Sequence, residues 1–197
     1  MHRRSVLGGM ATVVAVLAGC VGAGGPNGSS DGTGDGEAPD SGVADNPSSA
    51  HDGEVPVEIR ERVLQDYGEA LEHAQAGMGA LQEAYEALDL EEYGWVARDA
   101  EDASEAFADA LDVLDDVDST ATDHDLESAR EVITAAEEYV WLLEAEAFHL
   151  RQAARADMDD EPETREEHLA ELSEVAHERD RRELPALADL EAALGLD

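Results

Sequence analysis

Residues 64–88 read LQDYGEALEHAQAGMGALQEAYEAL, and this stretch decides the fold class. Its apolar residues recur at alternating steps of three and four, which places them on one face of a helix in a heptad pattern. That face consists of Leu64, Tyr67, Leu71, Ala74, Met78, Leu81, Tyr85 and Leu88. Pro56 suits the first turn of such a helix, and acidic residues just after it favour the positive end of the helix dipole. The stretch predicts a long amphipathic helix that begins near Pro56.

Further segments downstream carry the same spacing. The face of the second predicted helix consists of Tyr93, Val96, Ala100, Ala103, Phe107, Ala110, Leu114 and Val117. The face of the third consists of Leu126, Ala129, Ile133, Ala136, Val140, Leu143, Ala147, Leu150 and Ala154. A fourth, weaker face carries Leu169, Leu172 and Ala176 before Pro185, which must kink or break the helix. A short amphipathic piece over residues 187–194 then ends at Gly195.

Three pairs of residues resemble helix-starting capping boxes. These pairs are Asp89 with Glu92, Thr122 with Asp125, and Asp160 with Glu163. We therefore expect the second, third and fourth helices to start at Asp89, Thr122 and Asp160, and we expect a turn over residues 118–122 before the third.

Four helices joined by short turns pack most simply as an antiparallel up-and-down four-helix bundle, here with a short extra C-terminal helix. A helical-repeat array is the alternative, but no repeat period appears in the sequence. The apolar faces are rich in Ala, which brings helix axes close together and leaves little room for an internal cofactor. No cofactor is predicted. Gly77 and Gly79, which flank Met78, have two interpretations: they allow a close approach to another helix, or they are tolerated surface positions.

The charge balance is extreme, with 49 Asp and Glu against 12 basic residues and a formal net charge of −37. All the basic residues are Arg. Such like charge opposes a compact state at ordinary ionic strength, but in molar salt the Debye length falls to roughly 3 Å. The composition therefore fits a protein that works in brine. It also excludes nucleic acid as a partner, because no basic footprint exists.

The first residues, MHRRSVLGGMATVVAVLAGC, form a short basic start, a mildly apolar run and a small-residue site. The apolar run is too short for a membrane span, which needs about 20 residues, and it predicts a signal peptide over residues 1–19. Arg3 and Arg4 open a stretch that resembles the twin-arginine export motif, although Val6 stands where Phe is common. Residues 17–20 (LAGC) resemble a lipobox.

These 20 residues make the chain similar to twin-arginine exported lipoproteins of haloarchaea. The resemblance implies export of a folded chain, cleavage before Cys20 and a lipid on its thiol. It places the protein at the cell membrane, lipid-anchored on the extracellular face. Cys20 is the only cysteine, so an internal disulfide or a Cys-based metal site is excluded.

Residues 20–54 are dominated by Gly, Ser, Asp and Pro, a composition that predicts a disordered linker. About 30 flexible residues span roughly 30 Å, enough to lift a domain off a lipid surface. Asn27 begins a glycosylation sequon. Residues 31–36 resemble a calcium loop, but Gly42 stands where the acidic ligand at position 12 belongs. The helical domain is predicted over residues 55–197.

The sharpest chemical lead is the Glu-x-x-His motif, which occurs at Glu146 with His149 and at Glu174 with His177. Paired motifs of this kind carry di-iron sites in ferritin-like bundles. Here the first pair flanks the apolar face of the third helix, whereas the second points away from its own. The two motifs therefore do not converge. A metal site at Glu146 and His149 stays a minor hypothesis beside a half-buried packing role for His149.

Trp141 and Phe148 lie seven residues apart, off the main apolar face of the third helix. They either form a partner-binding ridge or are covered by the fourth helix or the terminal segment, and we favour the second reading. Arg179, Arg181 and Arg182 form a basic cluster that we expect to form salt bridges between helices.

The sequence contains no nucleophile beside a base and no phosphate-binding Gly loop, so no enzymatic activity is predicted. The leading hypothesis is a lipid-anchored extracytoplasmic binding or scaffolding protein with an extracytoplasmic protein partner. The alternative is a metal- or solute-binding helical bundle that uses Glu146 and His149.

The charge balance predicts that folding needs salt. Dilution from molar KCl into dilute buffer lengthens the Debye length to roughly 30 Å at 0.01 M, so repulsion between carboxylates grows and helicity is lost. Circular dichroism across a KCl series measures this. An unchanged spectrum in dilute buffer would contradict the interpretation of the charge.

Overall fold

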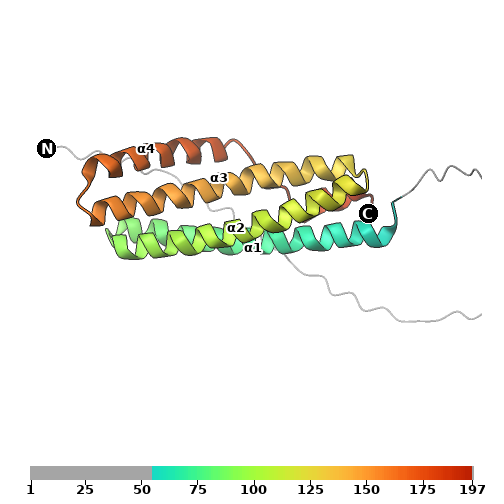
Figure 1. Ribbon diagram of the computed structural model, residues 1–197, viewed down its shortest axis with the longest axis horizontal. Coiled ribbons are helices and arrows are strands. Elements are labelled where there is room, and N and C mark those ends of the chain that lie inside the picture. The colour runs from blue at the N-terminus through green and yellow to red at the C-terminus, as the bar shows by residue number, and fades with distance from the viewer. Residues whose placement is uncertain (1–54, 197) are drawn as a thin grey trace, which may run out of the picture. The chain divides into compact units, whose positions relative to one another are not determined.

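The computed structural model describes residues 55–196; Arg3, Arg4, Cys20, Asn27 and the predicted linker lie outside this range. All the secondary structure in residues 55–196 is helical, which confirms the all-α class (Figure 1). The helices are α1 (Val57–Asp89), α2 (Tyr93–Asp123), α3 (Glu127–Met158), α4 (Pro162–Arg179) and α5 (Leu187–Leu194). None of them is long and apolar enough to cross a membrane.

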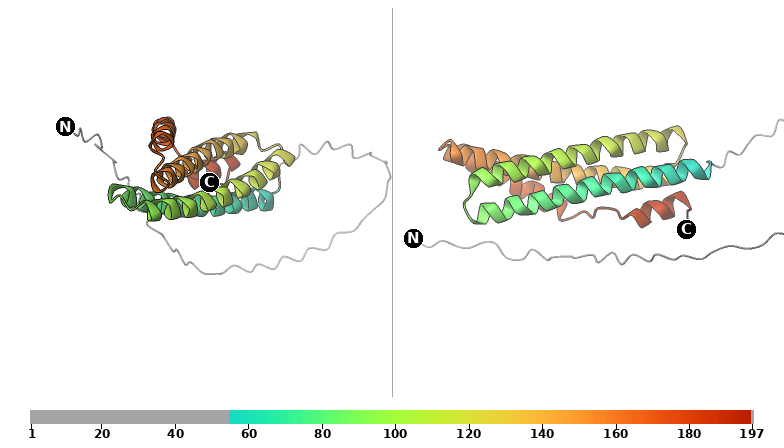
Figure 2. Two further views of the ribbon diagram at one scale, coloured as in Figure 1. Left: turned by 60° about the vertical axis from the view of Figure 1, so that its left-hand side comes forward. Right: turned by 90° about the horizontal axis from the view of Figure 1, so that it is seen from below.

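The three long helices form the core of the domain. α2 packs against both α1 and α3, whereas α4 packs mainly on α3 (Figures 1 and 2), with Arg165 of α4 lying over the Tyr93 ring of α2 at 5.8 Å. The short helix α5, near the C-terminus, lies against α1 and α3 (Figure 2). Two polar contacts fix this segment: Tyr67 donates its hydroxyl to the Pro185 carbonyl (2.9 Å), and Arg60 Nη1 donates to the Leu194 carbonyl (3.1 Å).

The turns after α1, α2 and α3 share one conformation. The middle residue of each has a positive φ, at Glu91 (60°), Asp125 (55°) and Asp160 (59°). The following N–H donates to a carbonyl five residues earlier, from Glu92 to Ala87, Leu126 to Ala121 and Glu161 to Ala156. These bonds satisfy the last carbonyls of each helix, as in a Schellman motif. Acidic residues therefore occupy a position that usually favours Gly.

This turn geometry corrects the predicted capping boxes. The residues before α2, α3 and α4 are Glu92, Leu126 and Glu161, and none makes a side-chain capping hydrogen bond. The predicted turn over residues 118–122 is also wrong, because α2 continues to Asp123. The apolar face of α2 extends one step further, from Val117 to the buried Ala121, and Arg130 of α3 pairs with Asp118 at 3.0 Å.

The last two helices follow the sequence prediction. α4 ends at Arg179, ahead of Pro185, and Gly195 ends α5 in the left-handed conformation (φ 65°). α4 buries only Leu172, in keeping with its weak apolar pattern.

The buried face of α1 differs from the predicted one by a small rotation. Tyr67, Ala74 and Leu81 are buried as expected, but the positions between them shift one residue towards the N-terminus. The residues that take those positions are Val63, Ala70, Gly77 and Ala84. The larger Leu64, Leu71, Met78 and Tyr85 pack beside them, half-buried. The smallest side chains therefore lie where the helices approach most closely.

Alanine dominates the packing. Fifteen of the thirty buried apolar residues among those described are Ala, which allows helix axes to approach towards the short end of the usual 8–10 Å range. Among the described glycines, Gly77 has the least room for a side chain, because a Cβ there would lie 2.6 Å from the Phe107 ring of α2. Gly77 is therefore a close approach, whereas a Cβ at Gly79 would meet no atom within 4 Å.

Two substitutions in α1 separate packing from helix propensity. Gly79→Ala should stabilise the domain by about 1 kcal/mol, because Ala favours a helix over Gly. Gly77→Ala gains the same propensity but overpacks the buried Phe107 ring, which costs about 1–3 kcal/mol, so the two variants should differ by at least ~1 kcal/mol. Urea unfolding in molar KCl measures both. Equal stabilisation by the two substitutions would contradict the close approach.

Candidate functional site

Glu146 is the only charged residue that is fully buried in the described part of the chain, at 1% exposure. Its carboxylate accepts a hydrogen bond from Arg179 Nη1 at 2.5 Å and another from the Tyr85 hydroxyl at 3.1 Å. These partners come from the end of α4 and from α1, so the cluster joins elements that are distant in sequence. Arg179 also contacts Asp180 at 2.9 Å, which links the guanidinium to solvent-exposed charge.

Burial controls the electrostatics of this cluster. Removal of the Glu146 carboxyl from water raises its pKa, and the Arg179 charge and the Tyr85 hydrogen bond oppose that rise. Burial and the neighbouring Glu146 charge also raise the pKa of Tyr85. A buried ion pair of this kind adds little stability over an apolar replacement, but loss of one partner leaves the other charge uncompensated. The cluster therefore fixes the position of α4 on α3.

A second cluster lies further along the α3–α4 interface. His149 Nδ1 lies 3.3 Å from His168 Nδ1 of α4. The Phe148 ring contacts both imidazoles edge to face, with centroids 5.2 Å and 6.3 Å away, and the Arg151 guanidinium lies over the same ring at 5.8 Å. Burial and the proximity of His168 lower the pKa of His149.

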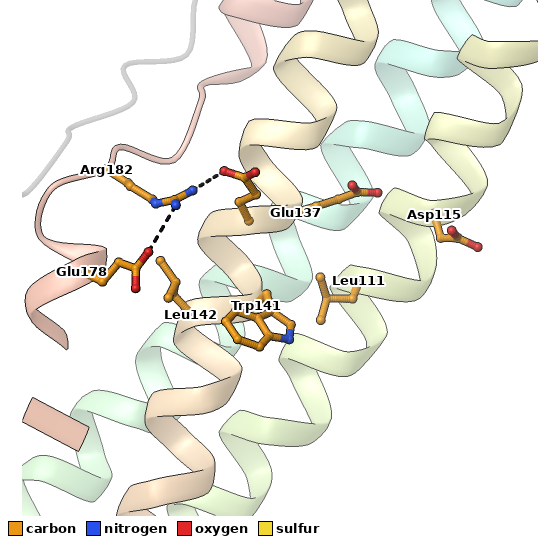
Figure 3. Close-up of a pocket in the computed structure, with 8 residues that line it drawn as sticks. Leu111, Asp115, Glu137, Trp141, Leu142, Glu178 and Arg182 are labelled. Carbon is orange, nitrogen blue, oxygen red and sulfur yellow. Dashed lines mark hydrogen bonds and ion pairs between the residues drawn. The ribbon is translucent and has the colours of Figure 1, made fainter. Parts of the chain in front are cut away.

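A shallow groove of about 540 Å³ opens where α2, α3 and the end of α4 meet. Trp141 lies across it, directed towards Leu111 of α2, with Leu142 on the other side (Figure 3). Arg182 closes one end through ion pairs to Glu138 and Glu178. Asp115 and Glu137 line the opposite wall (Figure 3). Burial and the charges of Asp118 and Asp115 raise the pKa of Glu137, as expected where carboxylates crowd together.

The residues proposed from sequence as metal ligands have separate partners. Glu146 points to Tyr85 and Arg179, whereas His149 points to His168. Glu174 and His177 are exposed on α4. Within residues 55–196, no group of three or more His, Cys, Asp or Glu side chains lies close enough together to hold a metal ion.

The favoured prediction that both aromatic residues of α3 are covered is wrong for Trp141, which is 59% exposed. Phe148 is 37% exposed and partly covered by His168. The end of α4 reaches the groove with Glu178, on the side of Leu142, and leaves the Trp141 indole exposed (Figure 3). The expected salt bridging by the Arg cluster is confirmed for Arg179 and Arg182, which both pair with carboxylates of α3.

Sequence reasoning missed Tyr85, His168 and the pairing of Arg179 with Glu146. Tyr85 was assigned to the apolar face, where its hydroxyl gives no periodic signal. His168 lies 19 residues from His149, so no local spacing joins them. The sequence signal for this ion pair is a Glu next to the apolar positions of α3 together with an Arg cluster at the end of the following helix.

Comparison of the chain with protein-family models, with curated proteins and with solved structures finds no match.

The buried ion pair predicts a large effect of removing its cation. Arg179→Met should lower the unfolding free energy by about 3 kcal/mol at pH 7, because Glu146 loses its compensating charge. The matched control, Arg182→Met, removes only exposed pairs and should cost less than ~1 kcal/mol. Urea unfolding measures both losses.

The loss should also depend on pH. The folded-state pKa of Glu146 lies above its ordinary value of 4.5. Protonation of this carboxyl therefore contributes to the free energy of unfolding below pH 4.5, and the contribution is lost as the pH rises. Without Arg179 the pKa rises further, and the deficit of Arg179→Met against the wild type should therefore shrink as the pH falls towards 4.5. Equal, pH-independent losses in the two Arg variants would show that Glu146 is not the cause.

Proposed function

We propose that the chain is a lipid-anchored, extracytoplasmic binding or scaffolding protein of a halophile, and that its partner binds at the Trp141 groove. The exposed indole in a groove with apolar and acidic walls is the observation that carries the proposal. No catalysis is proposed.

The anchor follows from the sequence. The twin arginines, the lipobox and Cys20 support export and lipidation, and residues 21–54 supply a tether of roughly 30 Å. One lipid group gives only marginal anchoring unless it is long or doubled. Such a tether would hold the helical domain near the membrane while leaving its surface open to other exported or membrane proteins.

We further propose that the helical domain is an antiparallel up-and-down four-helix bundle in which α4 and α5 share the fourth position. Short turns join α1 to α4, and each of these helices contacts its neighbour in sequence. α5 contacts both α1 and α3, whereas α4 packs on α3 without packing on α1. The two helices therefore complete different parts of the α3 surface. In this arrangement α4 leaves Trp141 uncovered, and a partner completes the interface.

The chemistry of the groove indicates the kind of partner. Trp141 offers an aromatic face, and the half-buried Leu111 adds apolar surface, whereas Leu142 beneath them is buried. Asp115 and Glu137 give the groove a negative wall, and the nearby guanidinium of Arg182 is engaged with Glu138 and Glu178. An apolar anchor next to a Lys or Arg side chain of a partner protein fits this surface, because a cation is attracted both to carboxylates and to an indole face.

Salt affects these contributions differently. Long-range attraction between an acidic surface and a basic partner is screened in brine, where the Debye length is only a few Å. Apolar contact and a cation lying directly on the indole act at short range and survive that screening. The indole should therefore carry more of the binding than the surrounding carboxylates.

Native purification tests the function. The lipoprotein is solubilised from membranes in molar KCl, and proteins that accompany it are identified by mass spectrometry. A stoichiometric companion is expected with the wild type and should be lost, with binding weakened at least about tenfold, in Trp141→Ala.

The chain offers a matched control in Trp95, which is 53% exposed at the start of α2 and lies outside the groove. Trp95→Ala should retain the companion. Cys20→Ser should leave the membrane fraction yet still bind the companion in solution, which separates anchoring from recognition. A companion that binds both Trp variants equally, or a wild type that purifies alone, would contradict the proposal.

A further inference from the structure

The pair formed by His149 and His168 is not explained by the proposed partner binding. The two imidazoles come from different helices, and both are half-buried at the surface of the α3–α4 interface. Their Nδ1 atoms lie 3.3 Å apart, and the two rings are tilted by 46° with their centroids 5.5 Å apart. Two nitrogen atoms therefore face each other across a boundary between elements.

This separation matches a chelate. Two imidazole nitrogens bound to one tetrahedral zinc ion, each at about 2.0–2.1 Å, lie roughly 3.3–3.4 Å apart. A single hydrogen bond between two neutral imidazoles gives the same distance, with one Nδ1 protonated and the other accepting. The two Nδ1 atoms therefore already lie at the spacing that two nitrogen ligands of one metal ion require.

The surroundings favour a cation. Glu144 and Glu171 act electrostatically on His149, and both raise its affinity for positive charge. Ser104 of α2 donates a hydrogen bond to Glu144 at 3.1 Å, which holds that carboxylate in place. The Phe148 ring packs against both imidazoles and limits their rotation. Arg151, which lies over the Phe148 ring, pairs with Glu101, so its charge is already partly balanced.

We propose that His149 and His168 together bind a divalent transition-metal ion of the borderline class, such as Zn²⁺, which links α4 to α3. Imidazole nitrogen selects such ions over Mg²⁺ and Ca²⁺, which prefer oxygen ligands. Two protein ligands leave the other coordination positions to water, so the ion is exchangeable. This site differs from the Glu146–His149 pair suggested by sequence, because Glu146 is occupied by Arg179.

Equilibrium dialysis with Zn²⁺ tests the site in the full chain. Every sample carries Cys20→Ser to remove the thiolate, and molar KCl with a large excess of Mg²⁺ occupies the surface carboxylates. Compared with this background, His149→Gln and His168→Gln should each lose about one bound Zn²⁺ per chain, and the double variant should lose no more than either alone. The control His177→Gln changes an exposed histidine of α4 that contacts Arg181, just after the end of that helix, and this variant should bind as much Zn²⁺ as the background does.

A second readout needs no substitution in the pair. Co²⁺ added to the background protein should give the visible absorption of a low-symmetry site with nitrogen ligands, and Zn²⁺ should displace it. Zn²⁺ should also slow proteolysis within α4, because it ties that helix to α3. Equal Zn²⁺ binding by the background and both pair variants, or a Co²⁺ spectrum identical to that of the hydrated ion, would overturn the proposal and leave a hydrogen bond as the role of the pair.

Discussion

The close approach of α1 to α2 determines the rest of the domain. Ala70, Gly77 and Ala84 leave space on α1, and the Phe107 ring of α2 fills the gap at Gly77. This geometry brings two long helices together over their whole length, and it places larger side chains such as Met78 and Tyr85 at the edges. The resulting apolar contact offsets part of the repulsion among the surface carboxylates.

Tyr85 connects this apolar core to the polar interface with α4. Because it lies at the edge of α1, its hydroxyl reaches the Glu146 carboxylate, which also receives Arg179. A carboxylate with both of these partners restricts the position of the C-terminal end of α4. α4 itself buries a single residue, Leu172, so apolar packing alone specifies its position weakly. Polar geometry therefore supplies the specificity that the apolar pattern of α4 lacks.

Periodicity predicted the existence and type of every described helix, including the break before Pro185 and the end of α5 at Gly195. It failed at the turns, where backbone hydrogen bonds with an acidic residue at positive φ replaced the predicted side-chain caps. It also misplaced the buried face of α1 by one residue at alternate positions, because spacing cannot tell which of two adjacent residues faces the nearest helix. The contacts of Glu146, His149 and Trp141 depend on where α4 ends and packs, and no local pattern contains that information.

The way α4 is held has a consequence for how the domain responds to its surroundings. Apolar packing among α1, α2 and α3 weakens mainly with heat or denaturant. α4 is held in addition by the ion pair of Arg179 with Glu146, and this pair responds to pH because protonation of the Glu146 carboxyl removes its charge. α4 packs mainly on α3, and it reaches α2 through Arg165, whose guanidinium lies 5.8 Å from the centre of the Tyr93 ring. A change of pH can therefore act on the attachment of α4 without acting directly on the apolar contacts of α1, α2 and α3, whereas repulsion among surface carboxylates acts on the whole domain.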